Sequence, residues 1–422
     1  MSLNRRQFTR LLALAGPVAV APRPLEWLKQ APLSQREGDG EAYWARVRAE
    51  FVMPADLAMF NAANLCPSSR RVIDTLQKYT ADVDRDPSPS NRGKLGPARE
   101  ASRALIAERL RVTPEEIVIT RNTSEANNLV SSGLDFKAGD EVLIFADNHP
   151  SNHNAWRDKA ARAGFTVKIL EQPNPHPGTE YYVDVVTKAI TPRTRLLSMT
   201  HVTSTVGDVL PVAELCRLAR ERNVLTLVDG AQSFGVLDVD LGKIQPDFYS
   251  GSAHKWPCGP RETGVLYVRQ AVQERLFPTV ISLYGGAVGA SRRFEANGQR
   301  DEAAMIAFGE AMALQKEIGP ARIDARVRAL ARALADGLRK IDGVKVWTSP
   351  EPDRAAAIVS FQPAALDIRR LNTALYEKDR IICATRGGAD RGGLRFSPHF
   401  YNSMAEIDRT IDAIGRYVKN GV

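Results

Sequence analysis

The middle of the chain, from about residue 51 to residue 300, alternates short apolar runs with segments of helical periodicity. EVLIF at 141–145 and VLTLV at 224–228 are apolar runs of this kind, and 124–134 and 212–222 are helical segments between such runs. A strand that is apolar along most of its length is buried on both faces, as in a parallel sheet covered by helices. The alternation therefore predicts an α/β fold with a mostly parallel central sheet covered by helices.

Changes in this pattern divide the chain into parts. We assign residues 51–300 to a large domain. A long helical pattern at 301–317 is followed by helices interrupted by short strands, which predicts a connecting helix and a smaller C-terminal α+β domain over residues 301–422. Residues 22–50 are rich in proline and charge, with little periodicity, and predict an arm or linker. A chain of 422 residues is ample for two such domains.

The first 21 residues have the organisation of an export signal. Arg5 and Arg6 precede an uncharged run from Leu11 to Ala21 that ends in a small-x-small pattern. This run is too short for a membrane-spanning helix, which needs about 20 residues. The paired arginines followed by x-Phe resemble a twin-arginine signal. We expect residues 1–21 to be a signal peptide, the protein to be periplasmic, and the twin-arginine export machinery to be a partner. A basic amphipathic N-terminus is the alternative.

Composition excludes several classes of protein. Hydrophobic residues make up 44% and charged residues 25% of the chain, which is ordinary for a globular protein and excludes a disordered, collagen-like or multispanning chain. The net charge of +8 is scattered among acids, so we expect no nucleic-acid partner. The four cysteines lie far apart without a CxxC pair, so spacing gives no zinc or redox signature and leaves disulfides open.

Polar residues stand at the ends of the expected strands, where ligands bind in open α/β sheets. Thr123 and Ser124 lie in TRNTSEA at 120–126, a hydroxyl-rich turn that opens a helix. Free N–H groups and the helix dipole would favour a phosphate there, although such residues also cap helices. Asp229 ends an apolar strand and needs a cation or several hydrogen bonds; a helix cap is the alternative.

Two further residues complete this set. Lys255 lies in YSGSAHKW at 249–256, where desolvation would lower its pKa; an exposed, inert lysine is the alternative. His149 follows the strand at 141–145 in DNHP, where a purely structural histidine is the commoner case. Pyridoxal 5'-phosphate needs these groups together. A lysine holds its aldehyde as a Schiff base, an acid keeps its ring nitrogen protonated, a flat side chain stacks on the ring, and a helix N-terminus takes the phosphate.

Three motifs, in order and spacing, resemble the class V aminotransferases. They are HVTSTVG at 201–207, LVDGAQ at 227–232 and SAHK at 252–255. This family belongs to the fold-type I pyridoxal phosphate enzymes and includes cysteine desulfurases, selenocysteine lyases and isopenicillin N epimerase. The resemblance implies a fold-type I transferase, a homodimer, pyridoxal phosphate as cofactor, and a small amino-acid-type substrate.

The resemblance also implies roles for single residues. Lys255 would carry the cofactor and move protons, Asp229 would pair with the ring nitrogen, and His149 would stack on the ring. Gln232 would bond the phenolic oxygen of the cofactor. The phosphate would be held by Thr123, Ser252 and His254, with Ser124 a weaker candidate.

Two arginines receive substrate roles from the same resemblance. Arg395, in GLRFS at 393–397, lies on the strand whose arginine binds the substrate carboxylate, a bidentate task suited to a guanidinium; a solvated arginine at a strand edge is the alternative. Arg92, in SNRG at 90–93, falls where these dimers send an arginine across to the neighbouring active site.

The sequence also departs from the family. Desulfurases carry a nucleophilic cysteine just before the Arg395 strand, but residues 384–391 have none, and Cys383 comes too early and is expected to be buried. Arg386 and Arg391 in this stretch could meet a second acidic group on the substrate, or form a solvated loop.

A second departure is at 295–299, where EANGQ replaces the glycine and threonine that contact the phosphate across the dimer. Without a desulfurase cysteine, we expect an aminotransferase. The alternatives are an epimerase like isopenicillin N epimerase, a cysteine or selenocysteine β-lyase, and a binding protein without turnover.

Overall fold

The computed structural model describes residues 33, 38, 40–283, 285–387 and 390–422. The expected signal peptide at 1–21 therefore lies outside the described residues. No helix in the described part of the chain is both long and apolar enough to cross a membrane.

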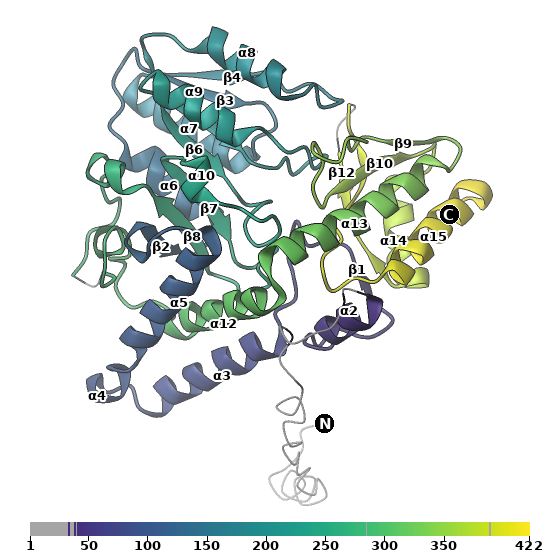
Figure 1. Ribbon diagram of the computed structural model, residues 1–422, viewed down its shortest axis with the longest axis horizontal. Helices are drawn as coiled ribbons and strands as arrows, with labels where there is room; N and C mark the ends of the chain where they lie inside the picture. The colour runs from purple at the N-terminus through teal and green to yellow at the C-terminus, as the bar shows by residue number, and fades with distance from the viewer. Residues whose placement is uncertain (1–32, 34–37, 39, 284, 388–389) are drawn as a thin grey trace, which may run out of the picture. The chain divides into compact units, whose positions relative to one another are not determined.

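A seven-stranded sheet forms the centre of the large domain (Figure 1). Its strands, in spatial order, are β2 (Ile117–Thr120), β8 (Gly264–Val268), β7 (Phe248–Ser252), β6 (Leu225–Asp229), β5 (Thr194–Thr200), β3 (Glu141–Phe145) and β4 (Thr166–Leu170). The ladders from β7 to β4 are parallel, and only β8 runs antiparallel to its neighbours. The predicted α/β fold with a mostly parallel sheet is therefore confirmed.

Helices cover both faces of this sheet. Neighbouring residues of a strand point to opposite faces: Ile144 shares a core with Trp156 of α7 (Pro150–Ala163) and Val130 of α6 (Thr123–Gly133). Phe145 instead packs against Tyr182, at a ring distance of 5.6 Å, so α8 (Thr179–Ala189) lies on the other face. Burial on both faces is the reason that an inner strand such as β3 is apolar along most of its length.

The remaining helices of this domain flank the sheet or connect its strands. They are α3 (Arg70–Arg85), α4 (Pro89–Arg92), α5 (Leu95–Leu110), η3 (Pro114–Glu116), α9 (Val212–Glu221), α10 (Leu241–Ile244), η4 (Gln270–Arg275), α11 (Ser291–Phe294) and α12 (Glu302–Ile318).

The smaller domain is built on a four-stranded antiparallel sheet. Its strands, in spatial order, are β12 (Ala384–Arg386), β13 (Gly393–Phe396), β10 (Val359–Pro363) and β9 (Val344–Val346). Helices α13 (Pro320–Arg339), α14 (Ile368–Asp379) and α15 (Met404–Asn420) share one apolar core with this sheet.

The segment before α3 differs from its sequence assignment. The expected arm contains a helix, α2 (Glu41–Arg48), which buries Tyr43, Trp44 and Val47. After it, β1 (Ala58–Met59) pairs in parallel with β11 (Ile381–Ile382) of the small domain. Alternating charges hide the apolar face of α2 in the sequence, and the pairing of β1 joins residues more than 300 positions apart. These residues therefore pack with the small domain and bring the 60–66 segment to the edge of the large sheet.

Candidate active site

Asp229 and Lys255 come together because β6 and β7 are parallel neighbours. Asp229 ends β6 and lies in register with Ser250 of β7. Strand β7 ends at Ser252, and Lys255 follows three residues later. The carboxyl ends of parallel strands open at one edge of the sheet, which is where such folds bind ligands.

The Asp229 carboxylate is buried and fixed by hydrogen bonds. It is 3% exposed. One oxygen accepts from the side-chain amide of Asn127 at 3.0 Å, and the other accepts from the backbone N–H of Ala231 at 3.0 Å. Asn127 in turn accepts from the Ser250 hydroxyl at 2.7 Å. Sequence analysis missed Asn127, which lies one helical turn after Thr123 and so faces the same edge.

Lys255 is half-buried and makes no ion pair in the described part of the chain. Burial lowers the pKa of its amine, and the positive charge of Arg386 acts in the same direction, while Asp229 opposes both. A lysine whose pKa is lowered holds more of the neutral amine at neutral pH, and this is the nucleophilic and basic form.

Next to these two residues, Thr123 at the start of α6 and Ser252 at the end of β7 form a small cup of hydrogen-bond donors. The Ser252 hydroxyl accepts from the Thr123 backbone N–H at 2.9 Å and lies 2.8 Å from the Thr123 hydroxyl. His254 is half-buried, and burial together with Lys255 lowers its pKa to about 4. Ser124 is exposed, and the Thr123–Ser252 contacts do not include it. The structure therefore separates Ser124 from the cup.

His149 lies immediately before α7 and caps it. Its Nδ1 accepts from the Ser151 backbone N–H at 3.2 Å and lies 2.7 Å from the Ser151 hydroxyl. His149 is exposed in the single chain, but partial desolvation of its ring and the charge of Lys255 lower its pKa, while Asp229 raises it. The structure thus brings a neutral, oriented imidazole within electrostatic reach of both Lys255 and Asp229.

Gln232 links the site to its surroundings. Its amide oxygen accepts from the indole N–H of Trp256 at 2.8 Å, and its amide nitrogen donates to the Ala63 carbonyl at 3.0 Å. The amide group is therefore held in one orientation, with its second N–H available to another acceptor.

Arg395 reaches from the small domain toward the large one. It is 2% exposed. Its Nη1 donates to the Ser204 carbonyl at 2.9 Å, its Nη2 lies 3.4 Å from the side-chain oxygen of Asn61, and its Nε has no partner among the described residues. This geometry does not match the solvated arginine that was the alternative. A buried guanidinium that is only partly hydrogen-bonded can bind a carboxylate.

Arg386 lies on the same sheet face as Arg395. In the antiparallel pair β12–β13, Ala384 is opposite Arg395 and Arg386 is opposite Gly393. Residues two apart on a strand share a face, as do residues that are directly opposite. Burial lowers the pKa of Arg386, and its Nε has no partner in the described part of the chain.

Arg391 differs from Arg386, because it is neutralised within the chain. Its Nη2 donates to Asp147 at 2.7 Å, and its Nη1 also bonds this carboxylate. The alternative of a solvated loop is therefore wrong for Arg391.

Arg92 is not part of this group. It donates to Gln299 at 2.6 Å and lies 3.7 Å from Glu302, so within one chain the structure does not bring it to Lys255. Nearby Glu295, in the segment that departs from the family, is buried and pairs with Arg103. Through Glu295, the segment 295–299 is therefore anchored to Arg103 of the same chain.

Cys383 is buried, as predicted. It lies between β11 and β12, is 8% exposed, and its Sγ is 3.2 Å from the Asn372 side chain. Burial raises the pKa of its thiol. It is therefore a poor nucleophile.

Comparisons with known proteins identify the family and the fold of this chain. The family profile described as Aminotransferase class-V matches residues 60–410. Isopenicillin N epimerase of Streptomyces clavuligerus is 30% identical over 390 residues, covering 88% of this chain and 98% of that protein. A probable cysteine desulfurase of Pseudomonas aeruginosa is 32% identical over 390 residues, covering 85% and 93%. The solved structure of C-DES with glycine covalently linked to the PLP cofactor has a TM-score of 0.79 at 24% identity, covering 87% and 98%, which shows the same fold.

Pyridoxal phosphate fits the groups that the structure gathers. Thr123 and Ser252 offer phosphate donors at the start of a helix. The fixed Asp229 carboxylate suits a protonated ring nitrogen, and the Lys255 amine suits an aldehyde. The chain belongs to the class V aminotransferase family, and its cofactor is pyridoxal phosphate.

Proposed function

We propose that this protein is an exported, homodimeric aminotransferase that removes the α-hydrogen of an amino acid carrying a second acid group. The observation that carries the proposal is Lys255, an amine whose pKa burial lowers, beside the fixed carboxylate of Asp229. When bound, pyridoxal phosphate supplies an electron-accepting ring that weakens the bond between an attached amino acid and its α-hydrogen.

The residues of the site divide the work of this reaction. Asp229 holds a proton on the ring nitrogen, and its two hydrogen bonds keep the carboxylate in place for that task. Lys255, as the neutral amine, accepts the α-hydrogen as a proton and returns it. His149 covers the ring with its imidazole, whose neutral form is favoured because partial desolvation and Lys255 lower its pKa. Arg395 binds the α-carboxylate and fixes the α-hydrogen toward Lys255.

The position of Arg386 favours a substrate with an acidic side chain. It and Arg395 are diagonal neighbours on one sheet face, a relation that places two residues about 7–8 Å apart. Both have an unpartnered Nε in the described part of the chain, and the charge of Arg386 reaches Lys255 and His149. Two guanidinium groups at this spacing, neither with a carboxylate partner among the described residues, suit the two carboxylates of an amino acid such as glutamate.

Cysteine desulfuration has less support. Its nucleophilic thiol would have to come from residues 384–391, which contain no cysteine. Cys383 is buried in the small-domain core, and burial raises the pKa of its thiol.

Epimerisation is the second candidate. It shares the removal of the α-hydrogen and differs in the face on which the proton returns. The epimerase of Streptomyces clavuligerus, which matches 88% of this chain at 30% identity, favours it.

One experiment separates these activities. The holo-protein is incubated with single amino acids in deuterated water, while cofactor absorbance, α-hydrogen exchange and chirality are followed. Exchange with lasting conversion of the cofactor to its amine form supports transamination, and exchange with racemisation and an unchanged spectrum supports epimerisation. Release of sulfide from cysteine would indicate a lyase, and no exchange with any amino acid would refute the proposal.

The acidic substrate has its own test. Wild-type protein should bind glutamate at least about 10-fold more tightly than norvaline, since a charged hydrogen bond contributes about 1.5–3 kcal/mol. Arg386→Gln should remove this preference, while Arg369→Gln, which changes an exposed arginine of α14, should keep it. Equal binding of both amino acids by wild type would exclude a role for Arg386 in substrate choice.

Dimerisation is supported by an exposed apolar segment. Ile281 and Leu283 are 87% and 94% exposed, and Phe277 and Val280 add to the same segment. Apolar groups gathered on a surface favour a protein interface. Light scattering should give twice the chain mass, and changing Ile281 and Leu283 to aspartate should give the monomer.

Export is supported by the sequence alone, through Arg5, Arg6 and the uncharged run after them. Replacing both arginines with lysine should keep the protein in the cytoplasm. Mass spectrometry of the exported protein should find a new N-terminus after Ala21.

A further inference from the structure

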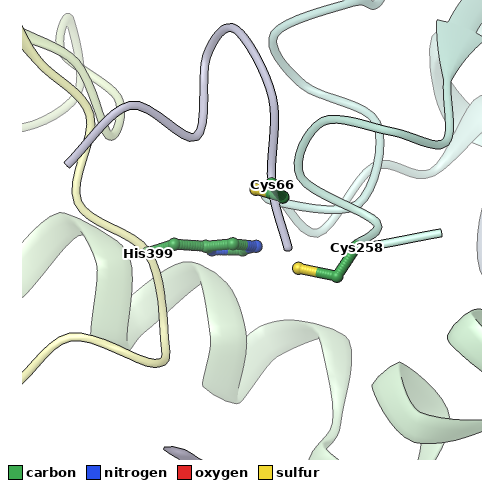
Figure 2. Close-up of side chains that lie close together, drawn as sticks. All are labelled: Cys66, Cys258 and His399. Carbon is green, nitrogen blue, oxygen red and sulfur yellow. The ribbon is translucent and has the colours of Figure 1, made fainter. Parts of the chain in front are cut away.

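Three side chains that can bind a metal lie close together beside the segment that carries Lys255. They come from parts of the chain that are far apart in sequence. Cys66, Cys258 and His399 each offer a ligand atom, and these atoms all lie within 4.8 Å of one another. The three residues are 5%, 1% and 0% exposed. Figure 2 shows the Cys258 sulfur and the His399 ring pointing toward each other, with Cys66 on a third segment beside them. None of the three has a role in the proposed reaction.

His399 is in the form that binds metals. Its ring is fully buried, where a charged imidazole without a counterion is disfavoured. Its Nε2 donates to the Trp256 carbonyl at 2.7 Å, and its buried Nδ1 has no hydrogen-bond partner among the described residues. Metal-binding histidines commonly donate one ring N–H to a carbonyl, which leaves the other nitrogen with a free lone pair. An unpaired buried nitrogen is costly, and the described residues leave Nδ1 in that state.

The two thiols supply the matching charge. Both thiols are buried, and a lone buried thiolate is disfavoured because its charge lacks compensation. A divalent ion bound by two thiolates and one imidazole has no net charge, which suits a buried site. The Tyr401 hydroxyl lies 3.7 Å from the Cys66 sulfur and can bond a thiolate or approach the fourth position.

We propose that Cys66, Cys258 and His399 bind one zinc ion. Binding forms two Zn–S bonds and one Zn–N bond, and the two thiol protons pass to solvent, with no electron transferred. Tetrahedral zinc with Zn–S bonds of about 2.3 Å places the two sulfurs about 3.8 Å apart, so small side-chain movements close the site.

The ion would fix the geometry of the catalytic segment. Cys258 follows Lys255 by three residues and donates its backbone N–H to the Lys255 carbonyl at 2.9 Å. Cys66 donates its backbone N–H to the His254 carbonyl at 2.8 Å. His399 follows the strand of Arg395. Zinc would therefore connect the segment that carries Lys255 to the strand that carries Arg395. It would be a structural ion that takes no part in the reaction.

Metal analysis of the holo-protein, purified without a histidine tag from zinc-supplemented cells, tests the proposal. We expect about one zinc per chain, and a loss of at least about 10-fold in Cys66→Ser and Cys258→Ser, since each removes one ligand. Cys216→Ser and Cys383→Ser are matched controls, because they change buried cysteines outside the cluster. They should keep the metal. Zinc that survives in both cluster variants would overturn the proposal.

Wild-type protein gives a second test that does not depend on how the variants fold. X-ray absorption at the zinc edge should show two sulfur neighbours and one imidazole nitrogen. Zinc affinity should fall about 100-fold for each unit of decrease in pH, because two protons are released. A protein that takes up no zinc from excess, or that is lighter by two hydrogens because Cys66 and Cys258 form a disulfide, would overturn the proposal.

Discussion

Arg103 and Arg395 are buried to nearly the same extent, at 0% and 2% exposed, but their surroundings differ. The guanidinium of Arg103 bonds both carboxylate oxygens of Glu295, the carboxylate of Glu100 and the Ile117 carbonyl. That of Arg395 has one carbonyl at 2.9 Å, one amide oxygen at 3.4 Å, and an Nε without a partner in the described part of the chain.

This difference separates charges that hold the fold from charges that await a ligand. A buried cation needs compensation. Arg103 finds it inside the chain, which makes its surroundings complete without a bound molecule. Arg395 and Lys255 do not. Lys255 follows β7 of the large sheet, and Arg395 reaches from β13 to the Ser204 carbonyl, in the segment after β5. We infer that changes near Arg103 mainly alter stability, and that changes at Lys255 and Arg395 mainly alter activity.

The largest effect is expected for Lys255→Ala. Activity should fall by at least about 10³-fold, because general acid–base transfer alone contributes about 10²–10⁴-fold and the cofactor also loses its covalent anchor. The free energy of unfolding should change by less than about 1 kcal/mol, since a cation without an ion pair is removed. Steady-state kinetics and urea unfolding of the same preparation measure the two quantities. Activity within 10-fold of wild type would remove Lys255 from the mechanism.

Glu295→Ala should have the opposite profile. It leaves the buried Arg103 guanidinium without its main counterion, so the free energy of unfolding should fall by about 3–5 kcal/mol. Below the unfolding transition, activity should stay within a few-fold of wild type. Urea unfolding gives the first quantity and kinetics at low temperature the second.

The double variant Arg103→Met with Glu295→Leu is the control. Replacing a buried ion pair with apolar residues is often neutral, so it should recover most of the stability that Glu295→Ala loses. A double variant as unstable as the single one would mean that packing, and not charge, explains the loss.

Arg395→Lys should lower kcat/KM by about 10–100-fold, because a lysine keeps the charge but loses the two-pronged contact worth about 1.5–3 kcal/mol. Stability should change little, since only the Ser204 carbonyl bond is lost at short distance. Kinetics with a series of amino acids provides the measurement. An unchanged kcat/KM would show that Arg395 does not bind the substrate carboxylate.

The sequence predicts the large domain well because burial on both faces leaves a local signal. EVLIF at 141–145 corresponds to β3 (Glu141–Phe145), and the helical pattern at 212–222 corresponds to α9 (Val212–Glu221). Polar residues directly after such strands, as at Asp229 and Lys255, are recognisable for the same reason. Their chemical roles rest on the family resemblance and stay predictions.

Features that depend on distant pairing could not be predicted in this way. Arg386 shares a face with Arg395 only through the register of β12 and β13. Cys66, Cys258 and His399 lie more than 130 positions apart from one another, and no spacing rule connects them. Which hydroxyl of residues 120–126 meets Ser252 likewise depends on the start of α6, where Thr123 contacts Ser252 and Ser124 is exposed.

The smallest expected effect is a change in the pH dependence of stability when His201 is replaced. His201 is a third kind of buried group, because its surroundings keep it neutral. Burial, with a contribution from Arg328, lowers its pKa to about 4, and its Nδ1 has no partner among the described residues. The unfolded chain therefore binds a proton below about pH 6.5 that the folded chain does not, so stability is full above that pH and falls as the pH drops toward 4. At pH 4.5 the loss from this one group is about 2 kcal/mol. Asp208, whose pKa burial raises to about 7, acts in the opposite direction.

Urea unfolding at pH 7 and pH 4.5 should therefore show a smaller loss in His201→Gln than in wild type, by about 2 kcal/mol. An equal loss in both proteins would mean that His201 takes up its proton in the folded chain, and that burial alone does not keep an unpaired imidazole neutral.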